Sequence, residues 1–249
     1  MTEHENERRW FKRFGRRGGP PGEIRLFCFH HAGGNAAAYR RWATLMPAGI
    51  ETVAVQLPGR ADRFHEPAHD DMALLLDDLV EAMEPLLDRP FACYGASMGA
   101  QVAWALAHFL RERALPMPRK LFLAARASPG TADDAWDQED RGGLKGLLRS
   151  MGGTPSEVLD EPEILSMLLP TLRADMSVLL THDPYPAVPL EVPIRAFAGA
   201  ADSSASPANM AGWRSATRGA FDLEVVSSGH FFDAAAEEQV VRSIARSLS

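Results

Sequence analysis

The chain has 249 residues, 46% of them hydrophobic, and a formal net charge of -7. This length and composition suit one large α/β domain, and the acidic charge argues against nucleic-acid binding, which needs a basic patch. No apolar run reaches the roughly 18 residues that span a bilayer, and the charged N-terminus lacks the apolar core of a signal peptide. We therefore expect a soluble, cytoplasmic protein with no membrane or nucleic-acid partner. Its cysteines, Cys28 and Cys93, lie in apolar runs and are expected to be buried and reduced.

Residues 1–22 form an N-terminal arm that is polar and then basic. Trp10, Phe11 and Phe14 alternate with arginines, and a Gly/Pro cluster at 18–22 ends the segment. The arm could dock an acidic partner, or its aromatic side chains could pack on the domain while the arginines stay solvated. We favour the second interpretation, so the folded domain is expected to be 23–249.

Strand-like and helix-like segments alternate along most of this domain. Apolar strand signals occur at 24–29, 52–57, 91–94, 121–126, 193–199 and 221–226, and helical spacing is seen at 71–87, at 101–110, after 206 and after 232. Such alternation predicts an α/β fold with a mostly parallel sheet and helices on both faces. Between 131 and 188 the alternation stops and only short helical runs occur. This stretch predicts a helical lid inserted above the edge of the sheet.

The segment His65-Glu66-Pro67-Ala68-His69 matches the metalloprotease pattern H-E-x-x-H. That pattern binds zinc only on a helix, where both imidazoles lie on one face. Pro67 stands between the two histidines and is incompatible with a helix interior. We therefore predict a loop here, with no metal site, and expect the protein to need no metal.

The segment Gly95-Ala96-Ser97-Met98-Gly99 joins an apolar strand to a helix and fits the G-x-S-x-G nucleophile elbow. In such an elbow the serine occupies a strained turn and its hydroxyl projects above the sheet edge. Side chains at either glycine would collide with the neighbouring backbone. Ser97 is therefore the candidate nucleophile.

Asp202 and His230 follow two successive strands, in the order serine, acid, histidine of α/β-hydrolases. His230 would accept the proton of Ser97, and Asp202 would fix the tautomer of the imidazole and stabilise its cation. Asp183 is an alternative acid, but it follows the lid helices rather than a strand.

The loop from His30 to Asn35 follows an early strand, where α/β-hydrolases place one donor of the oxyanion hole. The backbone N–H groups of Ala32 and Met98 are the candidate donors. The side chain of His31 could take part in oxyanion stabilisation, or it could only shape the loop. We favour the second role.

Several motifs together resemble the type II thioesterases, the stand-alone α/β-hydrolases that accompany polyketide synthases and nonribosomal peptide synthetases. The resemblance runs from about Trp10 to the final helix and rests on segments 29–34, 56–60, 94–100, 152–155, 172–175 and 229–232. It implies hydrolysis of stalled or aberrant acyl thioesters on the phosphopantetheine arm of acyl or peptidyl carrier domains. The cofactor would belong to the substrate and not to this chain. His30 and Ala96 depart from the family, which usually has proline and histidine there.

Apolar lid residues are expected to line the substrate pocket, in particular Leu168 and Leu172, together with His31 and Phe231. Because the chain is acidic, attraction to an acidic carrier would be local, through the N-terminal arginines or Arg60 and Arg63. A monomer is expected. The alternatives are a small-ester hydrolase or an acyltransferase on the same triad, and a non-catalytic carrier-binding protein.

Overall fold

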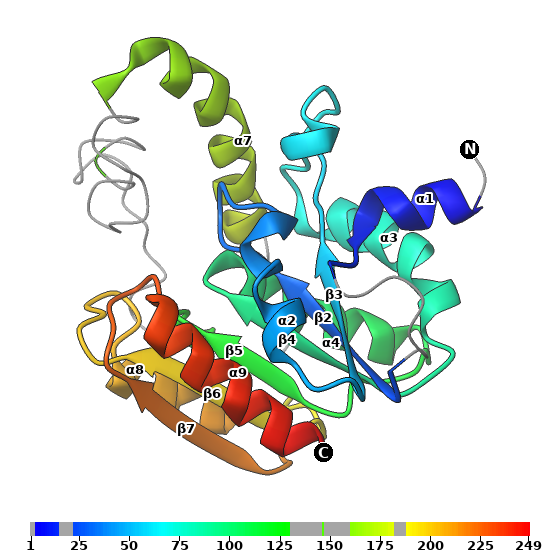
Figure 1. The fold of residues 1–249 in the computed structure, drawn as a ribbon, viewed down its shortest axis with the longest axis vertical. Helices are drawn as coiled ribbons and strands as arrows, with labels where there is room; N and C mark the ends of the chain where they lie inside the picture. Colours follow the sequence, from blue (N-terminus) through cyan, green and yellow to red (C-terminus); the bar gives the residue numbers. More distant parts are fainter. Residues whose placement is uncertain (1–2, 15–21, 130–145, 147–159, 182–187) are drawn as a thin grey trace.

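A computed structural model describes residues 3–14, 22–129, 146, 160–181 and 188–249 of the chain. Its centre is one seven-stranded sheet in the order β1-β3-β2-β4-β5-β6-β7 (Figure 1). The strands are β1 Phe11–Lys12, β2 Ile24–Phe29, β3 Ile50–Val55, β4 Phe91–Ala96, β5 Leu121–Ala124, β6 Ile194–Gly199 and β7 Phe221–Val226. All neighbours are parallel except β1, which pairs antiparallel with β3. The predicted α/β fold with a mostly parallel sheet is confirmed.

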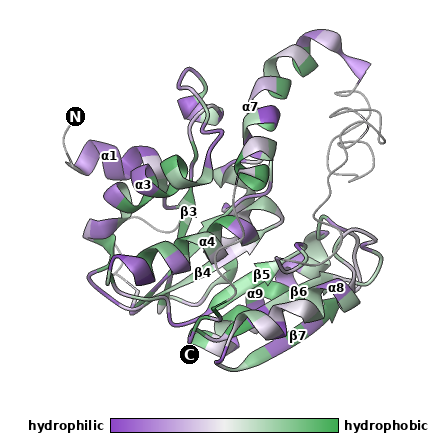
Figure 2. Ribbon diagram, turned by 180° about the vertical axis from the view of Figure 1, so that it is seen from behind, coloured by the Kyte–Doolittle hydropathy of each residue, from purple (hydrophilic) through white to green (hydrophobic). Residues whose placement is uncertain are grey.

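Helices cover both faces of the sheet. They are α1 Glu3–Trp10, α2 Trp42–Leu45, α3 Met72–Met83, α4 Met98–Glu112, α7 Pro162–Leu180, α8 Pro207–Ala211 and α9 Ala234–Leu248. Short 3₁₀ turns lie at η1 Ala36–Tyr39, η2 Ala61–Arg63, η3 Glu84–Leu86 and η5 Gly212–Ala216. One apolar cluster joins η1, α2 and α9 to one face, and a larger cluster joins α3, α4 and α8 to the other. In Figure 2 the central strands of the sheet are largely green, whereas β7 at its edge carries both green and purple segments.

The carboxyl ends of the parallel strands form one edge of the sheet, and they hold the residues considered below. Strand β4 is central, and its six residues are buried apart from the half-buried Ala96 at its end. Buried on both faces, such strands read as continuous apolar runs, which is why the sequence identifies them. Helix α7 rises beyond this edge in Figure 1.

The N-terminal arm is more ordered than the sequence indicates, because it contains α1 and the edge strand β1. Trp10 and Phe11 are each only 3% exposed and belong to the larger apolar cluster. The guanidinium of Arg63 lies 4.4 Å from the centre of the Trp10 ring. The aromatic side chains thus pack on the domain, as in the interpretation favoured above.

Local signals explain most element ends. Asp71 caps α3 by accepting a hydrogen bond from the Leu74 N–H, as expected for a carboxylate at this position. The helix predicted over 71–87 becomes a 3₁₀ turn after Met83, where Pro85 follows. Strand β5 ends before Ala125, whose φ of +52° cannot continue a strand.

Most of the predicted lid, 131–188, lies outside the described residues, and α7 is its described part. The segment His65–His69 is a loop, as predicted, so its two histidines do not share a helix face. Within the ranges given above, no helix combines the length and the apolar character needed to cross a membrane.

Candidate active site

Ser97 lies in a sharp turn between β4 and α4. Its backbone has φ 54° and ψ -117°, a combination that non-glycine residues rarely adopt and that costs roughly 1–3 kcal/mol. A Cβ atom added to Gly95 would lie 2.0 Å from the Gly99 carbonyl oxygen, and one added to Gly99 would lie 2.1 Å from the Phe29 oxygen. Both positions therefore require glycine, as predicted, and the turn has the geometry of a nucleophile elbow.

The side chains of Ser97, His230 and Asp202 form one hydrogen-bonded chain. The Nε2 atom of His230 lies 3.1 Å from the Ser97 Oγ, and its Nδ1 atom lies 2.9 Å from Asp202 Oδ2. With Nδ1 donating to the carboxylate, Nε2 is left to accept the hydroxyl proton. The arrangement can activate Ser97 as a nucleophile and stabilise the imidazolium that results.

Asp202 is held as an anion by its neighbours. Burial alone would raise its pKa, but hydrogen bonds from His230, from the Ala205 N–H and from Ser204 outweigh burial and lower the pKa to about 2. Its Oδ1 accepts from the Ser204 N–H at 2.9 Å, the Ser204 hydroxyl at 2.8 Å and the Ala205 N–H at 3.0 Å. Since Oδ1 is fully occupied, Oδ2 is directed at the imidazole.

Close contact between two loops brings Asp202 and His230 together. Asp202 follows β6 and His230 follows β7, and these strands are parallel neighbours. A Cβ atom at Gly199, the last residue of β6, would lie 2.2 Å from the Gly229 carbonyl oxygen. Glycine at this position therefore permits the approach of the two loops.

The loop after β2 carries Ala32, and α4 begins with Met98. In the described chain neither backbone N–H donates to another backbone oxygen, so both are available to a ligand. The next N–H, that of Gly33, donates to Asp175 Oδ2 at 2.7 Å. Gly33 has a φ of +73°, so glycine suits this tight loop.

Asp175 on α7 also forms a buried, bidentate ion pair with Arg60. Two Arg60 nitrogens each lie 2.8 Å from a different Asp175 oxygen, and the two side chains are 7% and 2% exposed. The Thr171 hydroxyl of α7 donates to the Gly59 carbonyl at 2.8 Å. Helix α7 is thereby fastened to the loop after β3 and to the loop that carries Ala32.

The proposed docking role for Arg60 and Arg63 is wrong. Both are 6% exposed, and Arg63 is engaged by Glu66 and by the Gln56 carbonyl. A buried guanidinium with such partners cannot attract an acidic surface. Of the arginines in the described part of the arm, Arg8 and Arg13 are exposed.

Two cavities lie in this region, and Ser97 and His230 line the first of them. The first, here called the serine cavity, has a volume of about 210 Å³. It is lined by His31, Ala38, Tyr39, Trp42, Tyr94, Ala96, Ser97, Ala124, Ala125, His230, Phe231, Phe232 and Glu237. The second, here called the α7 cavity, has a volume of about 250 Å³ and lies between α7, the loop at 59–64 and the Ala32 loop. The four predicted pocket residues His31, Leu168, Leu172 and Phe231 all line the α7 cavity.

His31 and Phe231 line both cavities and form the wall that the cavities share. Their rings meet edge to face with centres 4.8 Å apart. Burial, and then the nearby His230, lower the pKa of His31 to about 4. His31 is therefore neutral near pH 7, which fits a shaping role better than that of a cation.

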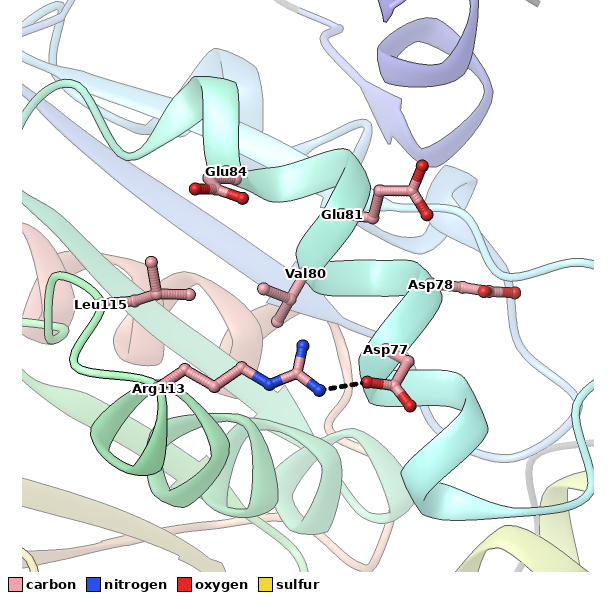
Figure 3. A pocket seen from close by; sticks show the side chains of 7 residues that line it. All are labelled: Asp77, Asp78, Val80, Glu81, Glu84, Arg113 and Leu115. Carbon is pink, nitrogen blue, oxygen red and sulfur yellow. Dashed lines mark hydrogen bonds and ion pairs between the residues drawn. The ribbon is translucent and has the colours of Figure 1, made fainter.

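A third depression lies away from these residues, between α3 and the end of α4 (Figure 3). Four carboxylates line it, those of Asp77, Asp78, Glu81 and Glu84. Arg113 also lines it and forms an ion pair with Asp77. None of the residues that line the serine cavity contributes to it.

Two other predictions concern the cysteines and the alternative acid. Cys28 and Cys93 are both buried and free, as predicted. Asp183 lies outside the described residues, and the acid that contacts His230 among the described ones is Asp202.

Asp175, Ser204 and Glu237 also belong to this region, although none of them was predicted as a site residue. Asp175 carried a signal, because a lone carboxylate on an apolar helix face needs a cation. Ser204, two residues after the acid, fits an Asx-type turn around Asp202. Glu237 shows no signal, since a glutamate in the first turn of a helix is common on electrostatic grounds alone.

Comparisons with known proteins identify the family of the chain. The family model of the thioesterase domain matches residues 24–248. A curated relative, linear gramicidin dehydrogenase LgrE from Brevibacillus parabrevis, is 38% identical over 91% of this chain and 88% of its own length. RedJ, a thioesterase of the prodiginine pathway in Streptomyces coelicolor, has a solved structure that is 31% identical, with a TM-score of 0.80 over 94% of this chain and 91% of its own.

A second solved structure is BorB, a type II thioesterase from the borrelidin biosynthetic cluster. It is 29% identical, with a TM-score of 0.80 over 96% of this chain and 98% of its own. The family model spans both β2 and α9, and thus every residue of the hydrogen-bonded chain. The chain belongs to the thioesterase family, among the type II thioesterases of polyketide and nonribosomal peptide pathways.

Proposed function

We propose that this protein hydrolyses acyl thioesters carried on the phosphopantetheine arm of carrier domains and so clears stalled or aberrant acyl groups from a modular synthase. The observation that carries the proposal is the Ser97–His230–Asp202 chain beside the serine cavity, which shares a wall with the α7 cavity, in a member of the thioesterase family. One cavity can hold an acyl group and the other can admit the arm.

In the first half of the reaction, Ser97 Oγ attacks the thioester carbonyl while its proton passes to His230 Nε2. The oxyanion that forms accepts hydrogen bonds from the N–H groups of Ala32 and Met98. The tetrahedral intermediate collapses, the carbon–sulfur bond breaks, and His230 returns the proton to the departing thiolate. An acyl-serine ester and a free thiol result.

In the second half, water replaces the thiol. His230 takes a proton from the water as it attacks the ester, and returns that proton to Ser97 Oγ when the acyl–oxygen bond breaks. A carboxylic acid leaves and the enzyme is restored. Asp202, whose pKa is held at about 2, stays ionised throughout and stabilises each imidazolium.

We assign the acyl group to the serine cavity and the arm to the α7 cavity. Ser97 lines the first cavity only, and every side chain around that cavity except Ala38 is buried or half-buried. The α7 cavity is lined by the exposed residues Phe64, Met167 and Leu168, which are 42%, 56% and 41% exposed. An arm attached to a carrier protein must reach solvent, and an apolar rim suits it.

The test is intact-protein mass spectrometry of acyl-loaded carrier protein, with and without the enzyme, and with Ser97→Ala as the control. We expect loss of the acyl mass with wild type, and a rate at least about 10³-fold lower with Ser97→Ala. Intact acyl carrier together with rapid turnover of simple esters would instead favour the small-ester hydrolase. Transfer of the acyl group to an added amine or alcohol in preference to water would favour the acyltransferase.

A non-catalytic carrier-binding role makes a different prediction. Ser97 would then not react with a fluorophosphonate, whereas an activated serine is labelled and Ser97→Ala is not. The name of one relative includes a dehydrogenase activity. The turn after β2 in this chain is His-His-Ala-Gly-Gly-Asn, which lacks the G-x-G-x-x-G dinucleotide fingerprint, so we do not extend that activity to it.

The partners follow from the same proposal. Acyl or peptidyl carrier domains of a modular synthase would present the substrate, and the phosphopantetheine would come with them. A monomeric state, a cytoplasmic location and the lack of a nucleic-acid partner stay predictions from the sequence.

A further inference from the structure

The serine cavity contains one carboxylate that has no partner in the part of the chain that the structure describes. Glu237 lies in the first turn of α9 and is half-buried, and its side chain makes no hydrogen bond or ion pair there. The neighbouring Glu238 is different, because it pairs with Arg41 and Arg242. A half-buried carboxylate without a partner is costly, and its position in a cavity suggests a ligand.

The charged groups around Glu237 do not neutralise it. Burial raises the pKa of Glu237, Arg41 opposes this and Asp233 adds to it. The Arg41 guanidinium is already engaged, however, by the Ala234 carbonyl at 2.9 Å and by Glu238 at 3.2 Å. Glu237 is therefore a carboxyl group that lines the cavity and lacks a direct counter-ion among the described residues.

Aromatic rings surround the same space. Tyr39, Trp42 and Tyr94 form a cluster with ring centres 4.5 to 5.9 Å apart. Phe231 and Phe232 line the cavity as well. A carboxylate beside several aromatic rings can bind an ammonium group, through its charge and through cation–π attraction.

Ser97, Ala96 and Glu237 line one and the same cavity, and the small side chain of Ala96 takes up little of its space. Residues 94 and 96 point to the same face of β4, and both line the cavity. Tyr94 precedes Ser97 by three residues, or roughly 10 Å of strand. A cationic group that reaches Glu237 would thus lie several bonds away from the thioester carbonyl.

We propose that Glu237 is a specificity-determining residue that favours acyl groups bearing a protonated or quaternary amine at their distal end. The proposal rests on thioester hydrolysis at Ser97. A cavity of about 210 Å³ has the volume of about seven water molecules at about 30 Å³ each, which suits a short acyl chain. The substrate class is therefore a short acyl chain that ends in a cation.

The test uses two acyl groups of the same shape on one carrier protein. The 4-(trimethylammonio)butanoyl group is cationic and cannot form a lactam, and the 5,5-dimethylhexanoyl group has carbon in place of nitrogen. We expect wild type to prefer the cationic thioester in kcat/KM, and the cationic-to-neutral ratio to fall about tenfold in Glu237→Gln. Glu237→Lys should lower the ratio further. Glu238→Gln removes the same charge one residue away, outside the cavity, and should leave the ratio unchanged.

The outcomes separate the two proposals. Hydrolysis of the neutral thioester with a ratio that Glu237→Gln leaves unchanged would overturn the role of Glu237 and keep the hydrolase. An equal change of KM for both thioesters would also overturn that role, because it would place the arm rather than the acyl group beside Glu237. If wild type hydrolyses neither thioester, thioester hydrolysis itself fails, and this inference fails with it.

Discussion

The buried Arg60–Asp175 pair leads to a quantitative prediction for the variant Asp175→Ala. The substitution removes both oxygens that accept the Arg60 N–H groups and leaves a guanidinium that is 7% exposed without a counter-ion. Removing one member of a buried ion pair costs about 3–5 kcal/mol. For a chain of this length, each kcal/mol lowers the melting temperature by about 2–4 °C. We therefore expect a fall of about 6–20 °C.

The control is the ion pair between Asp77 and Arg113 on the surface of α3 and α4 (Figure 3). Their side chains are 47% and 49% exposed, and exposed pairs contribute about 0–1 kcal/mol. Asp77→Ala makes the same chemical change beside the same kind of partner, and should lower the melting temperature by no more than about 4 °C. Thermal unfolding followed by circular dichroism at pH 7 measures both variants.

A double-mutant cycle with Arg60→Met isolates the pair itself. The double variant contains neither charge, so we expect it to be more stable than the sum of the single losses predicts, by about 1–3 kcal/mol. Because Asp175 also holds the Gly33 N–H beside Ala32, Asp175→Ala should lower kcat as well. A melting temperature close to that of Asp77→Ala, with no coupling in the cycle, would refute the reasoning.

Three further predictions concern other parts of the site. The pKa of His31 is lowered to about 4 from about 6.5, so between these pH values the unfolded chain binds one more proton than the folded chain. The free energy of unfolding therefore rises by about 1.4 kcal/mol per pH unit in this range. In His31→Gln, unfolding free energies measured with urea at several pH values should rise less steeply with pH, by that amount. Gly95→Ala should lower the free energy of unfolding by about 3 kcal/mol or more, and the melting temperature with it. Gly49→Ala, where a Cβ atom would meet open space, should melt near the temperature of the wild type. Ser204→Ala removes one donor to Asp202 and should lower kcat about fivefold with little change in KM.

The sequence identifies the residues of the hydrogen-bonded chain because backbone topology alone places them. Ser97, Asp202 and His230 each follow a parallel strand, and the carboxyl ends of such strands share one edge of the sheet. The edge strand β1 was not predicted, since two residues give no periodic signal and its pairing depends on contact with β3. The predicted arm at 1–22 thus includes a part of the sheet.

Side-chain networks that join distant parts of the chain are harder to predict. Arg60 and Asp175 are separated by 115 residues, and nothing in the local pattern of either shows that they meet. From the sequence, the positive charge of Arg60 therefore suggested that it attracts an acidic carrier protein. Its side chain is in fact buried and paired with Asp175. Glu237 escaped notice for a similar reason, because its importance depends on a cavity formed by η1, β4 and α9 together.

The two cavities also imply that recognition of the arm and of the acyl group can vary independently. Leu168 lines only the α7 cavity and Glu237 lines only the serine cavity, whereas His31 and Phe231 line both. With the arm in the α7 cavity, a change at Leu168 alters KM for every acyl group by a similar factor, and a change at Glu237 alters the ranking of the acyl groups. Asp175 ties α7 to the loop that carries Ala32, so the helix that we propose as a contact of the arm also steadies a candidate oxyanion donor. If the arm binds there, its binding is linked mechanically to the geometry at Ser97, and the serine cavity can vary without disturbing that link.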